Sequence, residues 1–215
     1  MSRILALIIG YFFGIIQAGY IYGRLHHIDI RDYGSGNAGT TNVMRTLGKK
    51  AGFITYFVDM LKAVAAAVVV HLLLGRFHRD IEALLFCYSG LGVVLGHNYP
   101  FYLGFKGGKG IAASSGVILS FVPYNFIMAI AGFCTFMITM FTTKYVSLAS
   151  LSMMLAFFFE FVIFGCLGDY NMGTGNLLEA YIIVFIITLL AFVRHRENIK
   201  RLAAGNERKI GQKKS

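Results

Sequence analysis

Three short polar segments hold nearly all the side chains in this sequence that could bind or transform a charged substrate. They span residues 34–42, 105–110 and 194–201, and Arg45 closely follows the first of them. The segments combine glycines, hydroxyls, amides and fixed positive charges, which are the groups that bind phosphate in proteins. Because the chain around them is strongly apolar, the sequence predicts a phosphorylated substrate that is met at a lipid surface.

The segment 34–42 combines a flexible backbone with polar side chains. Its three glycines permit close approach of the backbone to a ligand. One of its two adjacent threonines is predicted to cap a short helix whose free N–H groups face an anion, with Arg45 adding charge. A flexible cytoplasmic loop explains this segment equally well when it is considered alone. The hydroxyl and amide side chains come from Ser35, Asn37, Thr40, Thr41 and Asn42.

The segment 105–110 is similar to a phosphate-binding loop but does not match the nucleotide-binding pattern. Gly110 directly follows Lys109, so no hydroxyl stands where that pattern places a ligand for Mg²⁺. We therefore do not propose a nucleoside triphosphatase. Lys106 and Lys109 either bind phosphate or anchor the chain beside the membrane, and the segment alone leaves both alternatives open.

The segment 194–201 has the spacing of a reactive helix face. His195 and Asn198 are three residues apart, as are Asn198 and Arg201, so each pair shares a face if the segment is helical. A histidine can move protons or donate to an anion, and an asparagine can orient it or bind a hydroxyl. The alternative is a basic tail that follows the last membrane span.

The composition is that of a multi-pass membrane protein. Of the 215 residues 57% are hydrophobic and 14% are charged, whereas soluble domains carry about 25% charged residues. The mean hydropathy is +0.67. Little chain is left for a soluble part, so we expect one all-α domain over residues 1–215. The net charge of +10 lies in short loops between apolar runs, which indicates membrane topology and no nucleic-acid partner.

Apolar runs predict the transmembrane helices. The charge-free run 111–143 is too long for one span of about 20 residues. Pro123 favours two helices that meet near residues 121–125, although hydropathy alone also permits one long tilted helix. The other predicted spans are 4–22, 53–74, 81–103, 146–167 and 177–193.

The distribution of basic residues decides the orientation. If the run 111–143 crosses twice, seven transmembrane helices result and all three polar segments lie on one face. That face then carries 16 of the 20 Lys and Arg residues. Such an asymmetry places the three segments in the cytoplasm, together with the C-terminus, and puts the N-terminus outside.

Five residues inside the predicted spans need separate explanations. Asp59 and Lys62 are three residues apart, and a structural ion pair that holds their helix near the site is favoured over direct catalysis. Cys87, Cys134 and Cys166 have neither metal-site nor redox-pair spacing, so we expect small buried hydrophobic residues.

Together the motifs resemble the bacterial PlsY family, the acyl-phosphate:glycerol-3-phosphate acyltransferases. The resemblance rests on Gly34 to Asn42 with Arg45, on Gly96-His97 and Pro100 followed by residues 105–110, and on residues 194–202 followed by Gly205 and Glu207. The order of the motifs matches over the whole chain. Small departures occur at residues 112–114 and at Lys144.

The resemblance implies an activity and a location. A fatty acyl group would pass from acyl phosphate to the 1-hydroxyl of glycerol 3-phosphate, giving lysophosphatidic acid and phosphate. No cofactor, acyl-CoA, carrier protein or metal would be required. The enzyme would have seven transmembrane helices in the bacterial cytoplasmic (inner) membrane, with its active site facing the cytoplasm. The oligomeric state stays open, a monomer included.

We assign site residues on this basis. Arg45, Lys109 and Arg201 are expected to hold phosphate, and the glycines of the second segment are expected to let the backbone approach the acyl phosphate. His195 and Asn198 position the glycerol hydroxyl, and either His195 or the leaving phosphate takes its proton. The expected catalytic residues are Ser35, Arg45, His195 and Asn198. The expected substrate-binding residues are Asn37, Thr41, Asn42, Lys106, Gly107, Gly108, Lys109, Gly110, Ser147 and Arg201.

Two other functions compete with this one. In a transporter for an organic phosphate, the intramembrane residues Asp59, Lys62 and Glu160 would line a pathway. The polar residues crowd one face, however, and no inverted repeat is evident. A scaffold for other lipid enzymes would tolerate replacement of Ser35, Arg45 and His195.

Overall fold

The computed structural model describes residues 1–210, and this part of the chain is helical with no strand. Lys213 and Lys214, which belong to the expected domain and to its basic face, lie outside the described residues. Four short 3-10 turns complete the connections. The α-helices are α1 (Ser2–Gly14), α2 (Ala18–Leu25), α3 (Thr40–Leu47), α4 (Lys49–Leu73), α5 (Glu82–Asn98), α6 (Ile111–Ser120), α7 (Ile127–Thr143), α8 (Val146–Cys166), α9 (Thr174–Arg194) and α10 (Arg196–Ala203).

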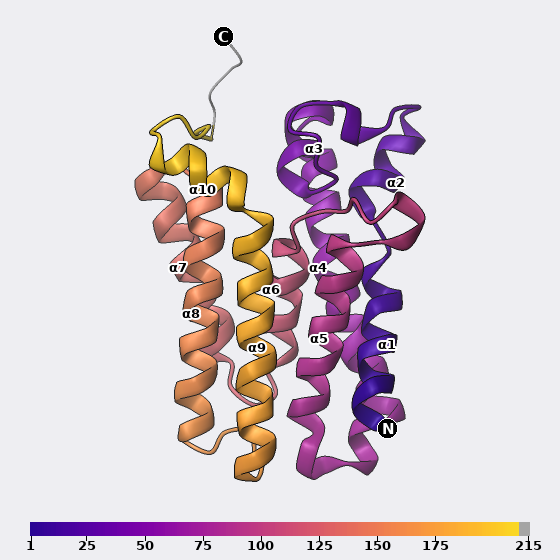
Figure 1. Ribbon diagram of the computed structural model, residues 1–215, viewed down its shortest axis with the longest axis vertical. Helices are drawn as coiled ribbons and strands as arrows, with labels where there is room; N and C mark the ends of the chain where they lie inside the picture. The colour runs from indigo at the N-terminus through magenta and orange to yellow at the C-terminus, as the bar shows by residue number, and fades with distance from the viewer. Residues whose placement is uncertain (211–215) are drawn as a thin grey trace.

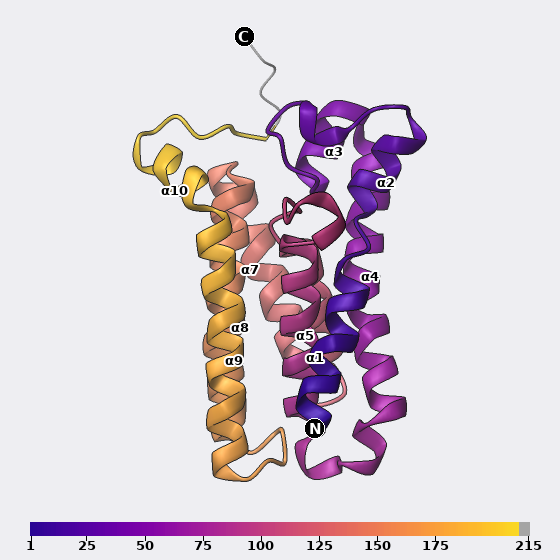
Figure 2. The same cartoon turned by 45° about the vertical axis from the view of Figure 1, so that its right-hand side comes forward.

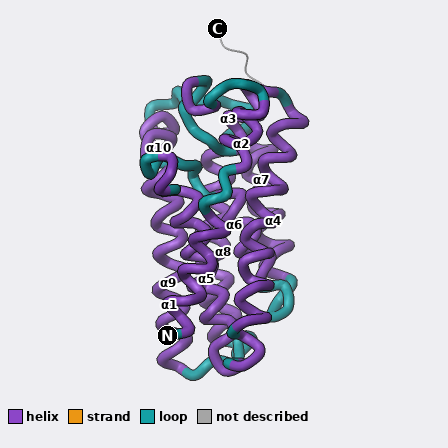
Figure 3. The backbone as a smooth tube through the Cα atoms, turned by 90° about the vertical axis from the view of Figure 1, so that its right-hand side faces the viewer, coloured by secondary structure: helices purple, strands orange, loops and turns teal. Residues whose placement is uncertain are grey.

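The long helices run side by side along one bundle, and the polar segments gather at one of its ends. Figures 1 and 2 show α2, α3 and α10 at the upper end, with the loop before α6 close by. The helix α1 begins at the lower end (Figures 1 and 3). We call the upper end the motif end, because all three polar segments of the sequence lie there.

Within residues 1–210, five helical stretches are long and apolar enough to cross a membrane. They are Ser2–Leu25, Lys49–Phe77, Arg79–Leu103, Val146–Cys166 and Thr174–Arg194. The run 111–143 forms two helices, α6 and α7, with a turn around Pro123, so the two-helix alternative is confirmed. This run descends from the motif end and returns to it (Figure 1). With 10 residues, α6 is shorter than a span of about 20 residues, and the number of seven crossings stays a prediction.

The predicted span 4–22 lies within the membrane-length stretch Ser2–Leu25, but its helix is interrupted. The helix α1 ends at Gly14 and α2 begins only at Ala18. The break frees main-chain carbonyls, and Lys62 Nζ donates to Gly14 O at 3.0 Å and to Ile16 O at 2.5 Å. A buried ammonium needs acceptors, so the break supplies what Lys62 requires.

Glycines let α1 and α5 touch backbone to backbone. A Cβ atom at Gly10 would overlap the main chain of Ser89, and one at Gly92 would overlap that of Leu7. Small residues at four-residue spacing permit such contacts between membrane helices. The contact fixes α5, whose far end leads into the second polar segment.

The expectation for the cysteines is confirmed only for Cys87. Cys134 and Cys166 are exposed on the bundle surface. The outer face of a membrane helix is as apolar as its buried face, so hydropathy does not distinguish the two. Glu160, in α8, has a buried Oε2 atom without a hydrogen-bond partner within residues 1–210.

We expect Gly92→Ala to destabilise the protein by about 1–3 kcal/mol, because the new Cβ must push α1 away from α5. Thermal unfolding in detergent measures the effect. The matched control is Gly175→Ala in α9, where a Cβ meets nothing within 4 Å. Equal midpoints for the two variants would contradict close packing of α1 on α5.

Candidate active site

Asn42 organises the first polar segment. Its Oδ1 accepts a hydrogen bond from Ser35 N at 2.8 Å, and its Nδ2 donates to Ile30 O and Tyr33 O at 3.0 Å each. Gly34 has a φ of +62°, and a Cβ there would overlap the Asn42 amide. Although the sequence suggests a substrate ligand, the Asn42 side chain is fully engaged in holding this loop.

The loop leaves its hydroxyls free and begins a helix without a side-chain cap. The helix α3 starts at Thr40 with Gly39 as its N-cap, so the prediction of a threonine cap is wrong. The side chain of Asn37 takes the Gly39 N–H at 2.9 Å and shapes this start instead. Ser35 is exposed, and its hydroxyl makes no hydrogen bond within the described residues. Thr41 lies in the first turn of α3.

The backbone of the second segment is held from both sides. Gly107 N donates to Asn98 O at 3.1 Å, and Gly108 N donates to His97 O at 3.0 Å. Arg194 binds the carbonyl oxygens of both glycines at 2.9–3.1 Å. A Cβ at either glycine would overlap His97. Glycine is therefore required here by contact with His97. The N–H groups of Gly107 and Gly108 already donate within the protein, so they are not open to a ligand.

The donors that remain open belong to the start of α6. Gly110, with a φ of +85°, is the N-cap of this helix. The first N–H groups of a helix have no partner inside it and attract anions. Lys109 immediately precedes this start. Lys106 is exposed, and its side chain makes no hydrogen bond in residues 1–210.

The carboxylate of Glu207 gathers four of the predicted site residues. Its Oε1 accepts from Asn198 Nδ2 at 2.7 Å and from Ser147 Oγ at 3.0 Å. Its Oε2 accepts from Arg201 Nε at 2.6 Å. Lys109 Nζ in turn donates to Asn198 Oδ1. Asn198 and Arg201 thus share a face of α10, as their spacing predicts.

Glu207 itself was not among the residues expected at the site. The available signal is a carboxylate within a basic tail, two residues after Gly205, which turns the chain with a φ of +69°. Burial acts to raise the pKa of Glu207, but hydrogen bonds from Asn198, Arg201 and Ser147 outweigh it, so this pKa lies below its usual value. The carboxylate is therefore charged at neutral pH.

Lys109 and Arg45 lie within the same electrostatic field. The pKa of Lys109 is lowered to about 8, mainly by burial. The charge of Glu207 opposes this decrease, and the charges of neighbouring arginines add to it. The pKa of Arg45 is lowered by loss of hydration and then by nearby Arg208. Arg45 makes no hydrogen bond or ion pair in the part of the chain that the structure describes. A positive charge without a partner is available to an anion.

His195 is held as a neutral proton acceptor. It lies between α9 and α10, is 3% exposed, and places Nδ1 at 2.8 Å from Ala191 O. Because a carbonyl can only accept, Nδ1 carries the proton and Nε2 keeps a free lone pair. Burial, and then the charge of Lys109, lower the pKa of His195 to about 4. Such an imidazole can orient a hydroxyl.

The three segments converge only in part. Arg45, which follows the first segment, lies close enough to Glu207 for the carboxylate charge to act on its pKa. Within residues 1–210, no hydrogen bond joins Ser35, Asn37 or Thr41 to the other two segments.

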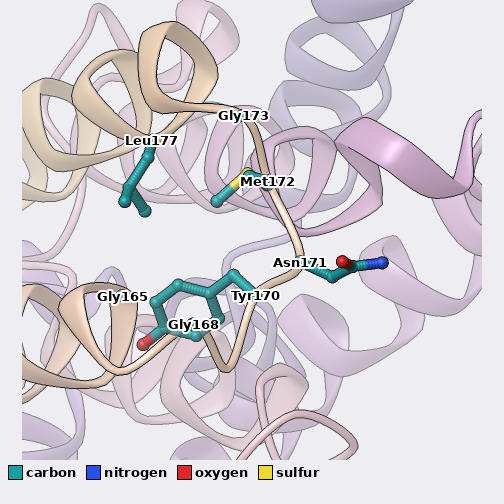
Figure 4. A pocket seen from close by; sticks show the side chains of 7 residues that line it. All are labelled: Gly165, Gly168, Tyr170, Asn171, Met172, Gly173 and Leu177. Carbon is teal, nitrogen blue, oxygen red and sulfur yellow. The ribbon is translucent and has the colours of Figure 1, made fainter.

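A cavity of about 370 Å³ lies between α8 and α9 at the opposite end (Figure 4). None of the predicted site residues lines it, and it is remote from the motif end.

Known proteins match this chain over its length. The family model described as glycerol-3-phosphate acyltransferase matches residues 4–205. A glycerol-3-phosphate acyltransferase of Alkaliphilus metalliredigens is 42% identical and covers 100% of both chains. One from Aquifex aeolicus is 36% identical over 98% of this chain and 100% of its own length.

Solved structures agree with the sequence relatives. Crystal structures of PlsY (YgiH), an integral membrane glycerol 3-phosphate acyltransferase, match in the glycerol 3-phosphate form with a TM-score of 0.82 and in the lysophosphatidic acid form with 0.80. Each is 34% identical and covers 98% of this chain and 96% of its own. The chain is thus a multi-pass integral membrane protein and belongs to the glycerol-3-phosphate acyltransferase family.

Proposed function

We propose that this protein transfers a fatty acyl group from acyl phosphate to the 1-hydroxyl of sn-glycerol 3-phosphate, forming 1-acylglycerol 3-phosphate and inorganic phosphate. Membership of the family supports the acceptor. The observation that carries the proposal is the convergence of Lys109, Ser147, Asn198 and Arg201 around Glu207, beside the open start of α6. These groups suit phosphate at the rim of an apolar bundle.

The orientation and extent of the protein are part of the proposal. Seven transmembrane helices in a single domain over residues 1–215 would place the motif end in the cytoplasm of a bacterium, at its inner membrane. The excess of Lys and Arg in the polar segments supports this orientation. The return of the run 111–143 to the motif end supports the two additional crossings (Figure 1).

Phosphate binding is assigned to charges and to one helix end. Arg45, Lys109 and Arg201 supply the positive charges, and the first turn of α6 at Gly110 supplies N–H donors. The hydroxyls of Ser35 and Ser147 contribute further donors. Lys106, Asn37 and Thr41 are retained as peripheral substrate contacts, whereas Asn42, Gly107 and Gly108 shape the binding loops.

The chemistry follows from the activated donor. Acyl phosphate is a mixed anhydride, so the glycerol hydroxyl can attack its carbonyl directly while phosphate leaves with the bonding electron pair. The enzyme then has to orient the hydroxyl and stabilise developing charge. Nε2 of His195 accepts a hydrogen bond from the hydroxyl. Because the low pKa of His195 disfavours its protonated form, the leaving phosphate is the better final acceptor of the proton.

The buried ion pair of Asp59 and Lys62 argues against the transporter. Asp59 and Lys62, which would line its pathway, are 1% and 5% exposed and bond to each other at 2.7 Å. They are therefore closed off from a substrate path.

The donor and acceptor are tested with purified protein, palmitoyl phosphate and glycerol 3-phosphate, in EDTA and without CoA. We expect phosphate release that requires glycerol 3-phosphate and equals the lysophosphatidic acid formed. Folded protein that yields no product with this donor, but does so with acyl-CoA, would contradict the donor assignment. Uptake of glycerol 3-phosphate into proteoliposomes without a donor would favour transport.

Removal of the proposed catalytic side chains should lower the rate by about 10²-fold or more, because positioning and charge stabilisation are lost. The variants are Ser35→Ala, Arg45→Ala, His195→Ala and Asn198→Ala, assayed in membranes at matched protein levels. Arg76→Ala and His78→Ala, at the opposite end of the bundle, serve as controls. Near-normal rates in all four variants would refute the assignment and favour a scaffold.

The pKa of Lys109 predicts an alkaline limit to activity. As the pH rises through about 8, Lys109 loses its proton and with it the charge that holds phosphate. We expect kcat/KM to fall above that pH, because this ratio reports the free enzyme. Lys109→Arg should retain the charge and move the decline to higher pH. An unchanged profile would show that Lys109 does not limit the rate, provided that the uncatalysed hydrolysis of acyl phosphate is subtracted.

A further inference from the structure

A buried group of charged side chains lies outside the proposed site, within the bundle. Lys62, Asp59 and His97 are 5%, 1% and 2% exposed. Lys62 Nζ donates to Asp59 Oδ1 at 2.7 Å and lies 2.9 Å from His97 Nδ1. Ionisable residues at this depth are costly, and they are commonly functional.

The group is connected to the break between α1 and α2. Lys62 Nζ also donates to the carbonyls of Gly14 and Ile16, on either side of the end of α1. Gln17, which is 1% exposed in the same break, donates from Nε2 to His97 O at 3.0 Å. A single cluster therefore joins α4, α5 and the break.

The cluster fixes the orientation of the His97 ring. Its Nδ1 lies 2.9 Å from Lys62 Nζ and 3.5 Å from Asp59 Oδ1, so the two charged side chains hold the ring by this edge. The Nε2 edge faces Gly108, where a Cβ would overlap it. The ring therefore supports the loop at the point where the loop has no side chain.

The same histidine also holds the loop through its main chain. His97 O accepts both Gly108 N at 3.0 Å and Gln17 Nε2 at 3.0 Å. Lys109 and the N-cap of α6 follow Gly108 directly. Consequently, a displacement of His97 would shift the ammonium of Lys109 and the first N–H groups of α6.

A purely structural tie does not require these charges. Asp59 Oδ2 and Gln17 Oε1 are buried without a hydrogen-bond partner among the described residues, so the cluster leaves two polar atoms unsatisfied. Well-packed apolar side chains of similar volume often hold helices together equally well or better than a buried ion pair. The directional contacts with His97 are what apolar side chains would not reproduce.

We infer that Asp59, Lys62 and His97 are positioning residues, which set the loop at Gly107 and Gly108 so that Lys109 and the start of α6 meet a substrate phosphate. This inference rests on the proposed function. It adds to the site a set of residues that touch no substrate and lie on the bundle side of the loop.

The main test is the double variant Asp59→Asn/Lys62→Met. Removal of both charges leaves no unpaired ion, so the protein should fold. We expect a lower thermal midpoint, because the carbonyls of Gly14 and Ile16 lose their donor, and a fall of about 10²-fold in kcat/KM per folded molecule, measured below that midpoint, through a misplaced phosphate site. The KM for acyl phosphate or glycerol 3-phosphate should rise, and a structural role would not produce such a change. A folded double variant with wild-type kinetics would overturn the inference.

A second variant covers the case in which the double variant does not fold. Gln17→Met removes the bond to His97 O and leaves the ion pair intact. We expect about a tenfold increase in KM per folded molecule, a loss of about 1.4 kcal/mol. A folded Gln17→Met protein with unchanged KM values would overturn the inference by itself.

The control is an ion pair at the opposite end of the bundle. Arg3 Nε bonds Glu179 Oε1 at 2.8 Å, and Arg3→Met/Glu179→Gln should leave kcat and both KM values unchanged. If the wild-type protein shows no acyl transfer, the proposed function is contradicted. If the wild-type protein is active and the double variant has the same kinetics, only the positioning role is contradicted.

Discussion

The ammonium of Lys62 is the interaction on which the arrangement of this bundle depends. Buried among apolar helices, it needs acceptors, and it finds them in the carbonyls that the interrupted first span releases at Gly14 and Ile16. The adjacent carboxylate of Asp59 balances its charge. The irregular backbone at residues 15–17 is thus stabilised by a side chain that follows Ile16 by 46 residues, in accordance with the rule that non-helical backbone inside a membrane protein must find internal partners.

The three polar segments of the site are held in place by different interactions. The backbone of the second segment is set by the close contact of Gly107 and Gly108 with His97 and by the hydrogen bonds from Arg194. The side chains of the third segment are set by a carboxylate, since Glu207 binds Ser147, Asn198 and Arg201 together. The first segment is held locally by Asn42, and Arg45, which follows it, lies within the electrostatic field of Glu207.

The sequence predicted the helices better than it predicted their interruptions. Hydropathy and charge located the apolar runs and the turn at Pro123, because lipid solubility and proline geometry are local properties. The break after Gly14 escaped prediction, since residues 15 and 16 are both isoleucine and the side chain that binds the freed carbonyls, Lys62, is distant in sequence. The roles of Asn42, Gly107 and Glu207 also escaped, because each depends on how the loop around it folds, even where the partners lie as near in sequence as those of Asn42.

The three-residue spacing of Asp59 and Lys62 has a consequence for the way in which the protein is made. Both belong to α4, so they can neutralise each other as soon as one turn of that helix exists, before α5 with His97 has been synthesised. The carbonyl acceptors of the first span precede them in the chain and are already available. A growing chain can therefore deliver this costly pair into the lipid as a neutral unit, and the site above it is completed only when the later helices arrive.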